Sequence, residues 1–201
     1  MTDYATLKTD VADYLARDDL ATVIPTFVRL AESRIRDKVR VLDMETTADL
    51  TITTQTTALP SGFLEHRRLI IDSSTYRRME YLPPDQAWRN VNYVDAGNPE
   101  FFTIEGTDLI VFPSPSESFT GKLLYLGAYD ALSADADTNW LLTNAYDIYL
   151  YATVAEAKSY IEDDEQAAKY LGQFNEACDR VNHTAQVGRR GTILKKVNNA
   201  P

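Results

Sequence analysis

Three consecutive carboxylates, Asp163, Asp164 and Glu165, come nearest to a catalytic group in this sequence. Paired carboxylates hydrolyse glycosidic bonds when they face each other in a cleft, at a defined separation and in contrasting environments. Three adjacent acids instead point in different directions and stay in water, where they suit the N-terminus of a helix. We therefore predict that Asp163 or Asp164 caps a helix. A carboxylate-based glycan hydrolase is kept as a remote alternative.

Histidine and cysteine chemistry is sparse. The sequence has two histidines, His66 and His183, and one cysteine, Cys178, and it lacks phosphate-loop, nucleophile-elbow, CxxC and HExxH motifs. Cys178 and His183 are five residues apart, whereas ligands on one helical face are three or four apart. We expect a buried Cys178, an exposed His183 and a surface position for His66. We predict no metal, no cofactor and no enzymatic activity.

Four tyrosines, Tyr146, Tyr149, Tyr151 and Tyr160, lie in one apolar stretch. Tyr149 and Tyr160 are eleven residues apart, about three helical turns, so we expect them to share a face. Apolar residues occupy nearly all sides of this helix, which indicates burial on several sides. The tyrosines pack in the chain's own core or between subunits, and an aromatic small-molecule pocket is a weaker alternative. We assign Tyr146, Tyr149 and Tyr151 to inter-subunit packing.

The composition is that of an ordinary globular protein of 201 residues, with 44% hydrophobic and 25% charged residues. No run of about 18 apolar residues occurs, so we predict no membrane span. The N-terminus lacks the pattern of a secretory signal, and a single cysteine fits a reducing, cytoplasm-like compartment.

The net charge of −10 is unevenly distributed, because residues 186–201 contain four cations and no acid. The acidic remainder repels phosphate, which argues against tight nucleic-acid binding by the folded part. The basic tail is either solvated or docks on a partner. Direct phosphate binding by its Arg and Lys pairs is a further alternative, which the acidic body opposes. The residues assigned to this docking arm are Val187, Arg189, Arg190, Ile193, Leu194, Lys195 and Lys196.

Helical periodicity is found at both ends of the chain. Residues 3–17 carry an apolar stripe with Asp3 as the predicted N-cap, and a second helix opens near Pro25. Arg34 and Arg36 belong to the mixed-charge side of this second helix, which faces either solvent or a neighbouring subunit. We assign both arginines to inter-subunit packing.

The middle of the chain has the Thr-rich alternation of β-strands, with Leu50 and Ile52 as inward-facing residues. A hairpin is predicted at 100–113, with its turn around Gly106. The other predicted elements are strands at 66–72, 76–82 and 121–132 and a short helix at 83–93.

A helical hairpin is predicted near the C-terminus. Its first helix begins at Thr143 or Asn144 and ends at Ile161, and Asn144 and Asp147 have the spacing of a capping box. The second helix carries an apolar seam formed by Ala167, Leu171, Phe174, Cys178 and Val181.

The predicted fold class is α+β. A helical bundle of two N-terminal helices and a C-terminal helical hairpin carries a β-rich antiparallel insertion, and an extended arm follows. The predicted boundaries are 1–45 for the N-terminal helices, 46–137 for the insertion, 138–185 for the hairpin and 186–201 for the arm.

Segments between Pro25 and Val181 together resemble the head–tail adaptor (connector) proteins of tailed bacteriophages. They are PTFVRLAESRIRDKVRVLDMETTADLTI, LPSGFLEHRRLII, GNPEFFTIEGTDLIVFPSP and NWLLTNAYDIYLYATVAEAKSYIEDDEQAAKYLGQFNEACDRV. The resemblance implies a non-enzymatic structural protein of the virion that forms a ring, expected to be a dodecamer, beneath the portal. A C-terminal extension grips the portal in such adaptors, and residues 187–196 match it by position.

The implied partners are other copies of the chain, the portal protein, a tail or nozzle protein, and double-stranded DNA that passes through the channel without specific binding. The implied location is the head–tail interface of the virion, after assembly in the host cytoplasm. A tail-completion or tail-tube-end protein of the same assembly is the alternative.

Overall fold

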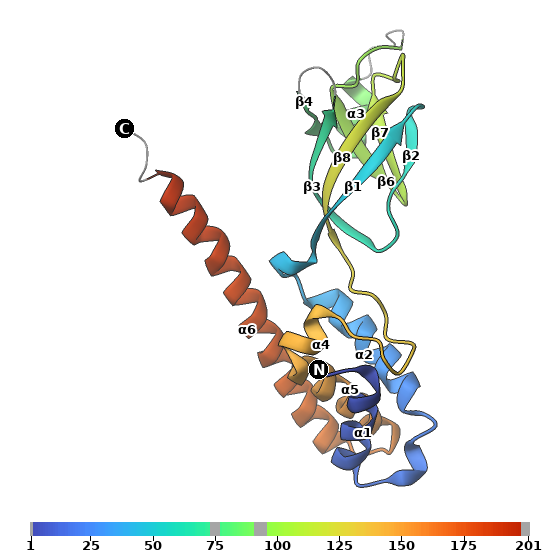
Figure 1. Cartoon of the computed structure of the whole chain (residues 1–201), viewed down its shortest axis with the longest axis vertical. Coiled ribbons are helices and arrows are strands. Elements are labelled where there is room, and N and C mark those ends of the chain that lie inside the picture. Colours follow the sequence, from blue (N-terminus) through green and yellow to red (C-terminus); the bar gives the residue numbers. More distant parts are fainter. Residues whose placement is uncertain (1, 73–76, 91–95, 198–201) are drawn as a thin grey trace. The chain divides into compact units, whose positions relative to one another are not determined.

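The computed structural model describes residues 2–72, 77–90 and 96–197, with side chains in those ranges apart from residues 18, 90 and 186–197. Six α-helices and two four-stranded sheets occur among these residues, which confirms the mixed α+β class (Figure 1). The chain divides into two compact units, each described here by itself. The helical unit comprises Met1–Asp43 and Tyr129–Pro201, and the β unit comprises Met44–Ala128.

The two N-terminal helices of the helical unit are α1 (Tyr4–Leu15) and α2 (Ile24–Lys38), with 3-10 turns at Asp18–Leu20 and Leu42–Met44. Asp3 caps α1 as predicted, since its carboxylate accepts a hydrogen bond from the backbone N–H of Thr6 at 2.9 Å. Pro25 lies in the first turn of α2, where its missing N–H costs no helical hydrogen bond.

The predicted helix from Thr143 or Asn144 to Ile161 is wrong in its start. The structure has a short α4 (Trp140–Asn144) and a separate α5 (Tyr146–Tyr160), because the backbone leaves the helical region at Ala145, with φ −141°. Asn139 caps α4 through its side-chain oxygen, which accepts from the N–H of Leu142 at 2.9 Å.

The predicted capping box of Asn144 and Asp147 does not form. Asn144 is the last residue of α4, and its amide donates to the backbone oxygen of Trp140 at 2.8 Å. Asp147 accepts instead from Arg180 at 2.6 Å. The S/T/N-x-x-D/E spacing is therefore present without the backbone geometry that a capping box needs.

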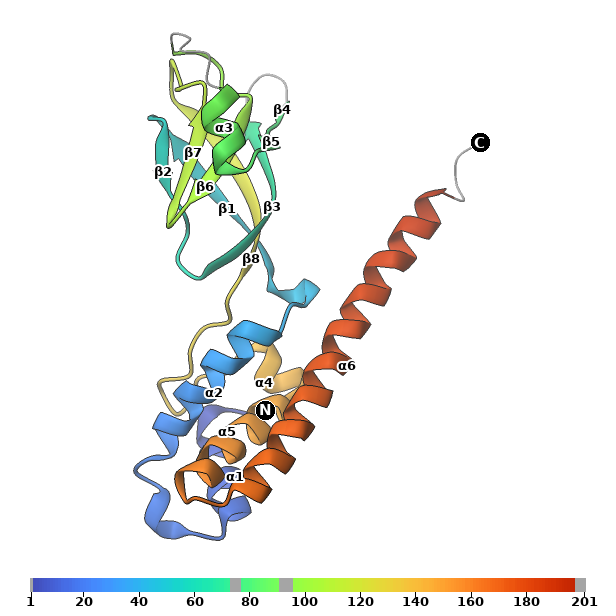
Figure 2. The same ribbon diagram turned by 180° about the vertical axis from the view of Figure 1, so that it is seen from behind.

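Helix α5 is the centre of the helical unit, in contact with α1, α2, α4 and α6 (Figures 1 and 2). This surrounds it with protein and confirms the burial on several sides that its apolar sequence predicts. Its buried residues are Ile148, Tyr149, Leu150, Ala152, Thr153, Val154, Ala155 and Ala157.

Helix α6 (Asp164–Val197) packs along α5, and Phe174, Ala177 and Cys178 are its buried residues. The outer members of the predicted seam, Ala167, Leu171 and Val181, are half-buried. The extended conformation predicted from residue 186 is wrong, since the backbone stays helical to Val197. Two glycines cost a helix about 1 kcal/mol each, but no proline breaks the hydrogen-bond ladder before 197.

The β unit contains two sheets. One has the strand order β1 (Glu45–Ile52), β8 (Phe119–Gly127), β3 (Phe63–Asp72) and β4 (Arg77–Arg78), and all its pairs are antiparallel. The other has the order β2 (Thr56–Ala58), β7 (Asp108–Phe112), β6 (Phe101–Glu105) and β5 (Glu80–Tyr81), with a parallel β5–β6 pair.

The predicted hairpin at 100–113 is confirmed as β6 and β7. Glu105 pairs with Asp108 across the two-residue turn, and Gly106 there has the positive φ of 61° that favours glycine. Leu50 and Ile52 point inward as predicted, with exposures of 8% and 0%. Gly121 of β8 makes room for this core, because a Cβ there would lie 2.8 Å from Ile52 Cδ1.

The core between the two sheets draws on both of them. Leu69 and Ile71 come from one sheet and Phe102, Leu109 and Val111 from the other. Helix α3 (Pro84–Asn90), predicted at 83–93, packs on the outer side of the β7–β6 sheet through Ala87, which joins Ile110 and Phe112 in a second small core.

Candidate docking surfaces

The three carboxylates of the α5–α6 turn do not form a reaction centre. Asp163 caps α6, since its side chain accepts from the N–H of Gln166 at 3.4 Å, and its other oxygen lies 3.4 Å from Lys158 Nζ. Asp164 and Glu165 are exposed in the first turn of α6. The capping prediction for Asp163 is confirmed, and its lysine partner was not foreseen.

The cysteine and the histidines lie apart from one another. Cys178 is 1% exposed, and burial raises the pKa of its thiol to about 12, so it stays a protonated, inert packing residue. His183 is exposed on α6. His66 is half-buried on β3, where its ring lies against Tyr81 at 4.2 Å between centroids. Among the described residues, no group of three or more metal-ligating side chains gathers.

The tyrosines assigned to inter-subunit packing separate into two kinds. Tyr149 is 2% exposed in the single chain, and its hydroxyl accepts a hydrogen bond from Asn139 at 2.8 Å. It therefore belongs to the chain's own core. Tyr146 is half-buried and donates to Asp10 of α1, whereas Tyr151 is half-buried with its ring 6.2 Å from that of Tyr170.

Tyr149 and Tyr160, which were predicted to share a helical face, differ strongly in exposure. Tyr160 is 61% exposed and lies against Phe27 of α2, with 5.3 Å between ring centroids. It is the last residue of α5, beyond the part of the helix that is enclosed on all sides. Position at the helix end, rather than angular spacing, decides its exposure.

Arg34 and Arg36 are both exposed on α2. Arg34 forms an ion pair with Glu156 of α5, and the two line a cleft of about 240 Å³ with Ser159 of α5 and Leu171 of α6. Small alanine side chains make up the rest of its lining. Arg34 therefore has a partner within its own chain while half of its side chain stays open to solvent.

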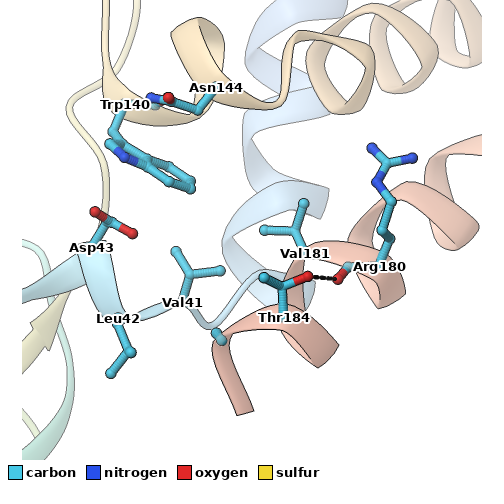
Figure 3. A pocket seen from close by; sticks show the side chains of 9 residues that line it. Val41, Leu42, Asp43, Trp140, Asn144, Arg180, Val181 and Thr184 are labelled. Carbon is cyan, nitrogen blue, oxygen red and sulfur yellow. Dashed lines mark hydrogen bonds between the residues drawn. The ribbon is translucent and has the colours of Figure 1, made fainter. Parts of the chain in front are cut away.

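A larger cleft of about 390 Å³ lies between α4, α6 and the segment after α2. Figure 3 shows Trp140 and Asn144 of α4 on one side, and Arg180, Val181 and Thr184 of α6 on the other. The lining residues are Val41, Leu42, Asp43, Trp140, Asn144, Arg180, Val181, Thr184 and Ala185.

The lining is largely apolar with polar groups at its rim. The indole of Trp140 is held in place by stacking on Tyr129, with the ring planes 8° apart and the centroids at 6.4 Å. Arg180 is held by Asp147, and Thr184 donates to the backbone oxygen of Arg180 at 3.0 Å. The cleft thus combines an apolar lining with charged and polar groups at its rim.

Sequence patterns did not single out this cleft. The sequence offers as a signal the tryptophan, Trp140, that directly follows the capping residue Asn139. Val41 and Val181 are 140 residues apart, and no periodicity connects positions at such a distance.

The predicted arm, residues 186–201, begins directly after this cleft. Ala185 lines the cleft, and the backbone of α6 continues helically to Val197. The side chains assigned to the arm lie outside the described ones; they are Val187, Arg189, Arg190, Ile193, Leu194, Lys195 and Lys196.

Within the described part of the chain, no helix combines the length and the apolar character needed to cross a membrane. The model of a family described as "SU10 adaptor protein" matches residues 2–194, which is nearly the whole chain. A search of the curated proteins gives no match.

Proposed function

The chain belongs to the SU10 adaptor family, and from this we propose that it is the head–tail adaptor of a tailed bacteriophage, a ring of copies beneath the portal. The ring, expected to be a dodecamer, extends the DNA channel and offers a platform to a tail or nozzle protein. It acts in the virion after assembly in the host cytoplasm, and it is structural rather than enzymatic. The family match over residues 2–194 is the observation that carries this proposal.

The helical unit supports a portal-docking role through the cleft between α4 and α6. An apolar, preformed cleft with a charged rim has the anatomy of a docking site for a partner's side chain. It is continuous along α6 with residues 187–196, which carry the basic residues Arg189, Arg190, Lys195 and Lys196. We assign the cleft and residues 187–196 to one portal-facing surface.

The second cleft supports contact between copies. Exposed Arg34, Arg36 and half-buried Tyr151 lie on α2 and α5, and small side chains leave an open groove beside Arg34. Heterologous ring contacts require two different patches on every copy. We assign Arg34, Arg36, Tyr146 and Tyr151 to one of these patches and leave Tyr149 in the core.

The charge of the chain suits a channel. A net charge of −10 leaves no general attraction for phosphate, so DNA passes without being held by neutralising contacts.

The first prediction concerns portal binding. Purified portal rings are mixed with the full chain and imaged by electron microscopy, and we expect an added ring beneath each portal. Deleting residues 187–201 should remove the added ring, because the basic segment is gone. Thr184→Trp should weaken binding by filling the cleft.

The matched control is Glu176→Trp, which places the same side chain at an exposed position of α6 outside both clefts. It should bind portal as the unchanged chain does. If the unchanged chain adds no ring to the portal, the proposed function is wrong. If the variant without residues 187–201 still binds portal but fails to attach a tail, the result favours the tail-completion alternative.

A further inference from the structure

The β unit presents two outer faces, one on each side of its core. Figure 1 shows β1, β8 and β3 in front, and Figure 2, from behind, shows α3 over β7 and β6. In each sheet, residues alternate between the core and the outside, and residues paired across strands lie on the same side. The register therefore assigns charged residues to each outer face.

The outer face of the β1-β8-β3-β4 sheet has an apolar centre with cations around it. Leu69 and Ile71 point to the core, so Arg68 and Ile70 of β3 point outward. Ile70 pairs with Arg78 of β4 on one side and with Lys122 of β8 on the other. Arg68 pairs with Leu124 of β8, which lies diagonal to Ile70 and is also half-buried.

Two arginines of this basic face form no ion pair within the described part of the chain. Arg68 and Arg78 are exposed, and among the described residues no carboxylate forms an ion pair with either of them. Lys122 lies 3.5 Å from Asp72 on the same face, and Asp49 of β1 pairs across from Lys122. A half-buried aliphatic pair with arginines around it is the anatomy of a protein interface, with an apolar centre and a polar rim.

The outer face of the other sheet is acidic and carries an exposed tryptophan. Trp88 of α3 is 50% exposed, packs edge-on against Phe112 at 5.0 Å, and donates through Nε1 to Glu105 at 2.5 Å. Glu105 pairs with Asp108, and Glu80 pairs with Phe101, which packs beneath α3.

The charges of this α3 face are predominantly negative. Asp85 lies exposed in the first turn of α3, and Arg89 is the cation of that helix. Tryptophan is a frequent binding hot spot, and arginine side chains stack well on its ring. The acidic residues of this face are Glu80, Asp85, Glu105 and Asp108.

We propose that the acidic α3 face of one copy docks on the basic β3–β8 face of the next copy, with Trp88 against Ile70 and Leu124. The two faces lie on opposite sides of one unit and are complementary in charge. A contact between two different patches of identical subunits repeats from copy to copy, as a ring requires. This inference rests on the proposed ring.

The observations favour a second copy over DNA as the occupant. The basic face has an aliphatic centre and contains Asp49 and Asp72, which repel phosphate. Within the same chain, the α3 face supplies both the carboxylates that Arg68 and Arg78 lack and an exposed apolar anchor.

The test is a charge swap in the full chain. R68E/R78E makes both faces acidic, and E80K/D85K makes both faces basic. We expect each variant alone to associate roughly tenfold more weakly or worse, since like charges then meet. A mixture of the two variants should recover association, because acidic faces again meet basic ones. Association is measured by analytical ultracentrifugation of the chains alone and by counting added rings on portal.

The matched control is Glu117→Lys, an exposed acid between β7 and β8 that lies on neither face. It changes the net charge in the same direction as the acidic-face variant and should leave association unchanged. Unaltered association of both charge variants, or no recovery in their mixture, would overturn the interface. If DNA rather than a copy occupies the basic face, R68E/R78E reduces DNA retention and leaves association intact, which also overturns it.

The failure of this interface is distinguishable from that of the proposed function. If both charge variants still form rings on portal, the adaptor function stands and the proposed interface is wrong. If the chains associate in the expected charge-dependent way but never bind portal, the interface stands and the adaptor function is wrong. If the chain forms no oligomer, either alone or on portal, both the interface and the adaptor function are wrong.

Discussion

At the scale of single residues, His66 is a histidine whose aromatic surroundings change its protonation. Its ring lies 4.2 Å from that of Tyr81 and 5.5 Å from that of Phe102, measured between centroids. Burial lowers the pKa of His66, with Glu65 raising it and Arg67 lowering it to smaller extents. The folded β unit therefore prefers the neutral imidazole.

The resulting prediction is a loss of stability in acid. In the unfolded chain, histidine has a pKa of about 6.5. As the pH falls below about 6.5, the unfolded state binds a proton before the folded state does, so the free energy of unfolding decreases until the lower folded pKa is passed. His66→Gln should flatten this dependence as the pH falls below about 6.5. Denaturant unfolding followed by Trp88 fluorescence measures it, with Trp140→Phe in all variants because Trp140 also fluoresces.

The control for this prediction is His183→Gln. His183 is exposed on α6, so its replacement should leave the dependence unchanged. If the free energy of unfolding of the unchanged chain and of His66→Gln depends equally on pH, the aromatic surroundings of His66 do not disfavour its charged form.

At the scale of elements, the start of α4 shows how one side chain organises a helix boundary. Asn139 accepts from the N–H of Leu142 at 2.9 Å, and its amide donates to the hydroxyl of Tyr149 at 2.8 Å and to the backbone oxygen of Asp130 at 3.2 Å. It thus caps α4 and satisfies a buried hydroxyl of α5. The Asn144 side chain, by contrast, donates an exposed hydrogen bond to the backbone oxygen of Trp140 at 2.8 Å.

We predict that Asn139→Ala lowers the free energy of unfolding by about 2–4 kcal/mol, the sum of a lost cap and an unpaired buried hydroxyl. Asn144→Ala, the same substitution at the position where the sequence pattern had placed the cap, should cost less than about 0.5 kcal/mol. Chemical denaturation monitored by circular dichroism compares the two. If the two substitutions cost the same free energy of unfolding, the assignment of Asn139 as the cap would be contradicted.

At the scale of the whole molecule, the described contacts between α6 and the rest of the helical unit end near Asn182. Cys178 is the last buried residue among the described side chains. Among the described side chains of α6, Asn182 is the last to bond another segment: it accepts from the N–H of Arg40 and donates to the backbone oxygen of Lys38, both at 2.8 Å. Residues 187–201 follow both.

Deletion of residues 187–201 is therefore expected to change the free energy of unfolding by less than about 1 kcal/mol, or about 2–4 °C in Tm. The same deletion is predicted to abolish portal binding, so folding and docking separate in one variant. Phe174→Ala is the positive control, expected to cost about 3–5 kcal/mol because Phe174 is fully buried. A deletion that melts like Phe174→Ala would assign the segment to the core.

The sequence by itself determined the class of fold, the inward-facing Leu50 and Ile52, the hairpin at Gly106, the caps at Asp3 and Asp163 and the adaptor family. These follow from local periodicity, turn chemistry and the order of motifs along the chain. Only the tertiary structure decided that a break at Ala145 separates α4 from α5, that Tyr149 lies in the core, and that α6 continues to Val197. The cleft beside Trp140 and the two charged faces of the β unit also depend on contacts between residues far apart in sequence, which no local pattern encodes.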